Sequence, residues 1–189
     1  SVSFQLSAMI LDDKRLNKQI IEAKTIHNSI IGEKESWINH PIVKMWKDYP
    51  DALALYYNEC LHQWKDIRHR NHSYEPIKVD VGVDKYDMKH VYHVSVYDIV
   101  SFPSWLGDER LHSSHRANLL RKDYEFYNKY GWNENTMEYW TMPYWWGEFG
   151  YGKVPIEKRK KDEVKVINEY SIKKVESKPT KYHIKGMVR

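Results

Sequence analysis

Residues 12–31 read DDKRLNKQIIEAKTIHNSII, and this stretch decides the expected fold. Its apolar residues recur at the spacing of one helical face, which predicts an amphipathic helix over about 12–31. Asp12 or Asp13 is a suitable N-cap, because a short carboxylate accepts hydrogen bonds from the unpaired amides of a first turn. Gly32 is a suitable stop. The stripe that would face a core consists of Leu16, Ile20, Ala23 and Ile30, with His27 in the same row.

Two further segments show helical periodicity. A second helix is predicted from Pro50 to about Arg70, and a third from Ser113 or Ser114 to Lys129. The first two helices are expected to pack through Leu16, Ile20, Leu53 and Leu61. Residues 91–97, VYHVSVY, are rich in β-branched and aromatic side chains, which favours a short strand or hairpin.

The expected fold class is therefore mainly α. The chain has 189 residues and is 41% hydrophobic, enough to bury a core. We expect a compact single helical domain over residues 1–152, with a short β-hairpin insertion. After Lys153 the composition becomes charged, so residues 153–189 are interpreted as a basic C-terminal extension.

Charge is unevenly distributed along the chain. The net charge is +4, but residues 1–150 sum to −3 and residues 151–189 to +7, counting Lys and Arg against Asp and Glu. A basic segment beside a near-neutral domain suits a polyanionic partner. A solvated tail without a partner is the alternative interpretation.

Composition argues against several classes of protein. Cys60 is the sole cysteine, which excludes an intrachain disulfide. No apolar run approaches about 18 residues, and no signal peptide is recognisable, so an intracellular protein is expected, either cytoplasmic or associated with a nucleoid or viral factory. The pairs His69/His72 and His112/His115 have helical spacing but lack a second pair with a carboxylate, so no metal site and no cofactor are predicted.

The first helix also carries a candidate site. Arg15, Lys18 and Glu22 are spaced by three and then four residues and so share one helical face. One interpretation is an ordinary solvated face with favourable ion pairs. The other is a carboxylate kept ionised among cations beside a phosphate backbone, able to act as a base or to stabilise an oxocarbenium ion.

A second basic segment lies further along the chain. Residues 114–122, SHRANLLRK, resemble the basic start of a helix, where side chains and free amides can both meet phosphates. The candidate phosphate ligands are Arg116, Arg121 and Lys122. A solvated face is again the alternative.

Three segments taken in order resemble the bacterial and viral branch of the pyrimidine-dimer DNA glycosylase family, the small phage-type base-excision enzymes. These segments are 11–22 (LDDKRLNKQIIE), 40–46 (HPIVKMW) and 103–122, which contains PSWLGDER and SSHRANLLRK. Each motif alone is weak, but the ordered set is fairly specific and spans about residues 7–132.

The resemblance implies a compact helical fold, double-stranded DNA as the substrate and no cofactor. It implies that the free amine left after removal of Met attacks the sugar C1′, that a Schiff base forms, and that the strand is cut by β-elimination. Glu22 matches the assisting glutamate of the first helix, and Ser1 carries the amine if it is the first residue of the mature chain. Nucleic-acid contacts are further implied at His40 and His115, in the second and third segments.

Departures from the family pattern keep a second hypothesis open. The family often has Arg beside the catalytic glutamate, where this chain has Ile20 and Ile21. Residues 78–100 and 153–189 look like additions to the family core that could contact protein partners. The alternative function is a non-catalytic, family-derived nucleic-acid-binding or structural subunit of a larger assembly.

Overall fold

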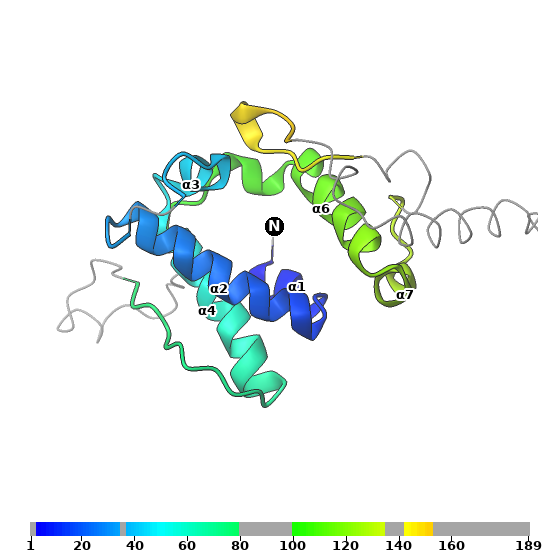
Figure 1. The fold of residues 1–189 in the computed structure, drawn as a ribbon, viewed down its shortest axis with the longest axis horizontal. Coiled ribbons are helices and arrows are strands. Elements are labelled where there is room, and N and C mark those ends of the chain that lie inside the picture. The colour runs from blue at the N-terminus through cyan, green and yellow to red at the C-terminus, as the bar shows by residue number, and fades with distance from the viewer. Residues whose placement is uncertain (1–2, 35–36, 80–99, 135–141, 153–189) are drawn as a thin grey trace, which may run out of the picture. The chain divides into compact units, whose positions relative to one another are not determined.

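The computed structural model describes residues 3–34, 37–79, 100–134 and 142–152 (Figure 1). Within these ranges the chain forms six α-helices and short 3-10 and π segments, and its one β feature is an isolated bridge between Trp145 and Tyr151. The predicted mainly α class is confirmed. The expected hairpin falls largely in residues 80–99, outside the described residues.

The chain divides into two units, treated separately below. Unit 1 comprises residues 1–112 and 145–151, and unit 2 comprises residues 113–144 and 152–189. The boundary expected at residue 153 stays a prediction.

Helix α2, Asp13–Ile30, forms where the sequence predicts it. Asp12 caps it by accepting a hydrogen bond from the Arg15 amide at 3.1 Å. Gly32 follows its end with a φ of +81°, a left-handed conformation that glycine adopts without strain. Of the predicted stripe, Leu16, Ile20, Ala23 and His27 are buried and Ile30 is half-buried; Ile26, which was not predicted, is buried as well.

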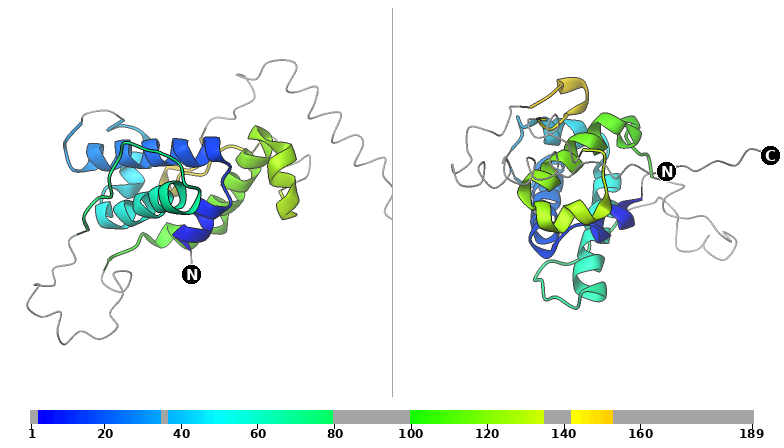
Figure 2. Two further views of the ribbon diagram at one scale, coloured as in Figure 1. Left: turned by 90° about the horizontal axis from the view of Figure 1, so that it is seen from below. Right: turned by 90° about the vertical axis from the view of Figure 1, so that its right-hand side faces the viewer.

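Helix α4, Pro50–His62, lies alongside α2 and completes the core of unit 1 (Figures 1 and 2). The predicted packing is confirmed, because Leu16, Ile20, Leu53 and Leu61 are at most 2% exposed. Burial of four such side chains contributes on the order of 1.5–3 kcal/mol each relative to solvent exposure.

The second helix was predicted to extend to about Arg70, and this C-terminal boundary was wrong. The α-helix ends at His62, a π-helical turn η1 covers Gln63–Ile67, and His69 adopts a left-handed φ of 51°. Tertiary contacts explain the early end. The Arg68 guanidinium donates to the Leu11 carbonyl at 2.7 Å and to Asp13 at 2.9 Å. These bonds hold residue 68 beside residues 11–13.

Two short helices flank this pair. Helix α1, Phe4–Met9, is capped by Ser3, whose hydroxyl accepts from the Leu6 amide at 3.2 Å, and it lies beside α4. Helix α3, Pro41–Trp46, begins with proline at its first position, where no amide hydrogen is needed. The sequence predicted neither helix, since six residues carry too little periodicity.

A smaller apolar cluster of unit 1 lies near α3. It contains Met45, Leu111 and Trp145, and Ile42, Trp105 and Trp146 pack against it. Trp105 belongs to the 3-10 turn η3, Ser104–Gly107, and the turn η6 covers Gly147–Phe149.

The third predicted helix differs at both ends. Helix α6 covers Glu109–Lys122, and it begins before Ser113 because the Asp108 carboxylate accepts from the Arg110 amide at 2.9 Å. Asp123 then starts a new helix, α7 (Tyr124–Tyr127), by accepting from the Phe126 amide at 3.2 Å. The 3-10 turn η4, Asn128–Tyr130, follows. Short polar side chains compete with helical hydrogen bonds, and here they decide the boundaries.

Candidate active site

Glu22 lies on α2 with its carboxylate partly open to solvent. Its side chain is 28% exposed, and Lys18 Nζ lies 3.3 Å from Oε1. Gln19 Nε2 donates to Oε2 at 3.2 Å. An ionised carboxylate has about four lone-pair sites, so these two contacts leave acceptor capacity for a bound molecule.

Gln19 is in turn held by Tyr56 of α4. The Tyr56 hydroxyl donates to Gln19 Oε1 at 2.9 Å. Burial raises the pKa of Tyr56 well above its ordinary value, and the charges of Cys60 and Glu22 act in the same direction. The hydroxyl therefore stays protonated and donates to the amide oxygen, while the NH₂ group of Gln19 faces Glu22.

The same tyrosine anchors the beginning of the chain. Phe4 is 6% exposed, and its ring lies 5.3 Å from that of Tyr56 and 5.9 Å from that of Phe102. A continuous set of contacts thus links Phe4, Tyr56, Gln19 and Glu22. Ser1, the predicted nucleophile, lies outside the described residues.

Arg68 fixes the end of α1. Besides Leu11 and Asp13, its guanidinium donates to the carbonyls of Ala8 and Met9 at 3.3 and 3.2 Å. Carbonyls at a helix end commonly lack internal partners, and Arg68 adds a donor for Met9 and a further one for Ala8, whose carbonyl also accepts from the Leu11 amide at 3.3 Å. Asp13 also accepts from Arg70 at 2.9 Å, and its hydrogen bond with Arg68 is the main cause of its lowered pKa.

Arg15 departs from the predicted cluster. It is 16% exposed and pairs with Asp12 at 3.4 Å rather than with Glu22. Of the three residues predicted to share a face, Lys18 and Glu22 are therefore the two that contact each other in the structure. Lys18, at 65% exposure, is the more accessible cation for a phosphate group.

His40 acts locally as the N-cap of α3. Its Nδ1 accepts from the Ile42 amide at 3.2 Å, so Nε2 carries the hydrogen of the neutral ring. The ring lies between Trp37 and Trp146, at 5.4 and 5.5 Å. A contact of His40 with nucleic acid stays a prediction.

The remaining predicted residues are in unit 2. Arg116 forms a bidentate ion pair with the buried Glu134 at 2.9 and 2.7 Å, and Arg121 is 8% exposed and donates to Asn118. Lys122 is exposed and donates to the Tyr144 hydroxyl at 2.8 Å. The exposed His115 ring lies 5.0 Å from that of Tyr144.

Two consequences follow for the predicted phosphate ligands. Because α6 begins at Glu109, residues 114–116 are inside the helix, and the expectation of free helix-start amides there was wrong. Burial of Arg121 leaves little of its guanidinium for an external phosphate. Among the predicted nucleic-acid contacts of unit 2, His115 and Lys122 have exposed side chains and are therefore better placed to meet a phosphate.

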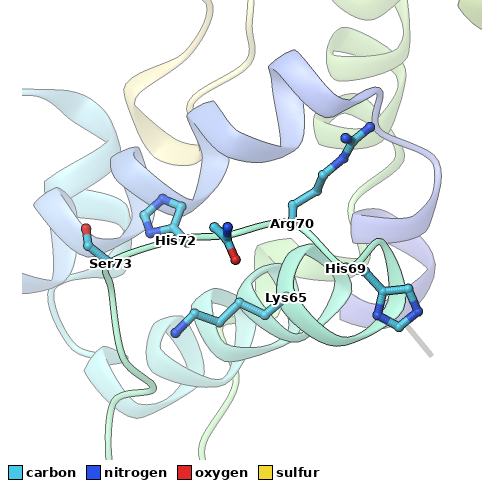
Figure 3. A pocket seen from close by; sticks show the side chains of 6 residues that line it. Lys65, His69, Arg70, His72 and Ser73 are labelled. Carbon is cyan, nitrogen blue, oxygen red and sulfur yellow. The ribbon is translucent and has the colours of Figure 1, made fainter.

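An open hollow borders the end of α4. It is lined by Lys65, His69, Arg70, Asn71, His72 and Ser73 (Figure 3). The lining contains no carboxylate, but Lys65 already pairs with Glu75 at 2.9 Å and Arg70 with Asp13. The His72 pKa is lowered, first by burial and then by the charge of Lys65.

Sequence reasoning missed several residues of the site. Gln19, Tyr56 and Phe4 were not singled out from the sequence. A tyrosine on a buried stripe is a usable signal, because its hydroxyl needs a hydrogen-bond partner. The identity of that partner depends on how α2 and α4 pack.

The described ranges contain no group of three or more His, Cys, Asp or Glu side chains arranged to bind a metal ion. Among the same residues, no helix combines the length and apolar character needed to cross a bilayer.

Comparison with known proteins finds a similarity for the N-terminal part of the chain. Residues 1–76 match the family model described as pyrimidine dimer DNA glycosylase. The match confirms the resemblance over this stretch, which includes α1 to α4; the third resembling segment, 103–122, lies beyond it. No curated protein and no solved structure matches the chain.

Proposed function

From the match of residues 1–76 to the pyrimidine dimer DNA glycosylase family, we propose that the chain excises damaged or modified pyrimidines from DNA and then cleaves the strand at the abasic site. The free α-amine at the start of the chain is the nucleophile, and Ser1 carries it where Ser1 is the first residue of the mature protein. Glu22 is the acid/base group. Pyrimidine dimers suit this chemistry, because a damaged base is poorly stacked and costs less to extrude.

In the proposed reaction the amine attacks the sugar C1′ and the bond from C1′ to the base breaks. The C1′–O4′ bond then opens, O4′ takes a proton, and the C1′=N bond of the Schiff base forms. Loss of a C2′ proton then breaks the C3′–O bond. An α-amine has a pKa of about 7.7–8.0, so a useful fraction is neutral and nucleophilic at pH 7. Glu22 stabilises the positive charge that develops at C1′ and accepts protons.

The observation that carries the proposal is the set of contacts from Glu22 through Gln19 and Tyr56 to Phe4. Phe4 is three residues from Ser1, so an amine carried by Ser1 would be tethered to the element that orients Glu22. An extended chain spans at most about 3.3–3.6 Å per residue, which limits how far the amine can lie from the anchored Phe4.

DNA backbone contacts are assigned to exposed cations. Lys18, next to Glu22, and Lys122 of unit 2 are the best exposed of the predicted phosphate ligands. Contacts of this kind fix position on the duplex without reading its sequence.

Borohydride trapping tests the proposal directly. Reduction should convert the Schiff base on dimer-containing duplex into a stable protein–DNA adduct, and acetylation of the N-terminal amine should abolish it. Glu22→Gln should bind the duplex nearly as well as wild type and release the base about 10²-fold more slowly. Glu33→Gln, at an exposed glutamate beyond the end of α2, is the matched control and should keep full activity.

One observation favours the second candidate, a non-catalytic nucleic-acid-binding subunit. Ile21, beside Glu22, is 43% exposed, so an apolar side chain occupies surface where the family often has Arg. One experimental result distinguishes the two candidate functions. Duplex binding without any adduct, in a protein whose N-terminal amine is verified by intact mass, would assign the binding role.

A further inference from the structure

Exposed aromatic rings gather on one part of unit 1. Among the described Trp, Tyr and Phe residues, the three exposed ones are Trp37, Phe149 and Tyr151, at 45, 41 and 51%. We call these three, with His40 and Trp146, the aromatic surface. The His40 ring contacts those of Trp37 and Trp146, and Tyr151 forms a backbone bridge with Trp145, the residue before Trp146.

The backbone next to two of these rings has positive φ angles. Trp37 has a φ of +65°, a conformation that bulky residues rarely adopt and that persists only where the surroundings enforce it. The turn that presents Phe149 uses two glycines with positive φ, Gly147 at 59° and Gly150 at 71°. It is closed by the Trp146 amide, which donates to the Gly150 carbonyl at 2.7 Å.

Cations lie beside the rings. The Lys44 ammonium is 5.8 Å from the centre of the Phe149 ring, and the Arg110 guanidinium is 4.5 Å from that of Trp145, a buried neighbour of the aromatic surface. Arg110 is 61% exposed and also pairs with Asp108 at 2.6 Å. Aromatic rings interleaved with Lys and Arg match a ligand that offers flat π-faces along an anionic backbone.

We propose that the aromatic surface binds single-stranded DNA by stacking its unpaired bases, with Trp37 and Phe149 as the platforms. The inference goes beyond the proposed function, because it needs neither a lesion nor the amine and Glu22. It assigns the enzyme a second contact with DNA, suited to bases that are unpaired near a damaged site.

The experiment compares two labelled 10-mers by fluorescence anisotropy, oligo-dT and the same backbone with abasic sugars. Both carry the same phosphates, so the difference in affinity isolates stacking. Wild type should bind oligo-dT about 10-fold more tightly, since base–aromatic stacking contributes on the order of 1–3 kcal/mol per base. Trp37→Ala and Phe149→Ala should each remove most of this difference and leave the abasic affinity unchanged.

Ile67→Ala is the matched control, because Ile67 is 55% exposed on unit 1 outside the aromatic surface, and it should behave as wild type. Circular dichroism and melting temperature check that each variant folds. Equal wild-type affinity for both oligomers overturns the proposal. So does a wild-type sedimentation coefficient that rises with concentration and stops rising in Trp37→Ala, which would assign the surface to self-association. Neither result bears on the borohydride adduct.

Discussion

At the scale of single residues, the contacts of Glu22 are set by a polar relay between α2 and α4. Tyr56 lies on the side of α4 that meets α2, and its hydroxyl finds a partner in Gln19 rather than in the backbone. The amide then presents its nitrogen to Glu22. The relay gives Gln19 and Tyr56 a positioning role that helical spacing alone did not indicate.

Tyr56→Phe tests this positioning role. The substitution keeps the ring against Phe4 but removes the donor, so the Gln19 amide can flip and Glu22 loses its fixed orientation. We expect base release to slow by about 10-fold with duplex affinity unchanged, less than for Glu22→Gln. Single-turnover kinetics beside a binding titration measure both. Unchanged base release in a folded Tyr56→Phe protein would contradict the role.

Cys60 provides a second residue-level prediction. The thiol is fully buried, and burial raises its pKa to about 12. Because only the thiolate reacts, the native protein should resist iodoacetamide at pH 8 and react readily in denaturant. Mass spectrometry of the alkylated protein follows the reaction. Rapid labelling of the native protein would show that α4 opens locally.

At the scale of elements, Arg68 joins the C-terminal end of the α4–η1 helix to the end of α1 and the start of α2. The ion pair of Arg68 with Asp13 makes stability depend on pH. The pKa of Asp13 is lower in the folded chain, chiefly because of its hydrogen bond with Arg68, so its stabilising effect is present above the unfolded pKa of about 3.9. This effect disappears as the pH falls through the folded pKa.

Asp13→Asn should therefore lower the melting temperature at pH 6, and the difference from wild type should shrink as the pH falls below about 4. The effect should be modest, since Asp13 is 46% exposed and solvent screens the pair. Thermal unfolding across this pH range measures it. Glu33→Gln, at an exposed carboxylate, should show no such trend. A constant difference at all pH values would count against the ion pair.

At the scale of the whole molecule, charge separates the C-terminal region from the rest of the chain. Residues 153–189 carry the entire positive excess, and we propose that they raise affinity for DNA without setting sequence preference. Removing them should weaken duplex binding and flatten the dependence of log affinity on log salt, by up to about 0.9 for each phosphate that the tail neutralises in the intact chain.

Binding isotherms at several salt concentrations provide the measurement. A variant with the tail lysines changed to glutamine keeps the chain length and serves as the control for truncation. An unchanged salt slope in both variants would exclude the tail as a polyanion contact. A changed slope with altered sequence preference would show that the tail does more than neutralise phosphates.

The sequence by itself determined the helical class, the α2–α4 core and the resemblance of residues 1–76 to a known family. Periodicity is local information, and the burial of Leu16, Ile20, Leu53 and Leu61 follows from it. Glu22 and Lys18 were also predictable, because a spacing of four residues brings side chains together on any helix.

Only the tertiary structure decided where α4 ends, where α6 begins and ends, and which groups contact Glu22. Arg68 reaches about sixty residues back along the chain to the carbonyl of Ala8, and Tyr56 reaches Gln19 on another helix. Such partners are chosen by helix packing, which no local pattern encodes. The aromatic surface has the same origin, because its residues come from positions 37–40 and 146–151, and only folding places their rings in contact.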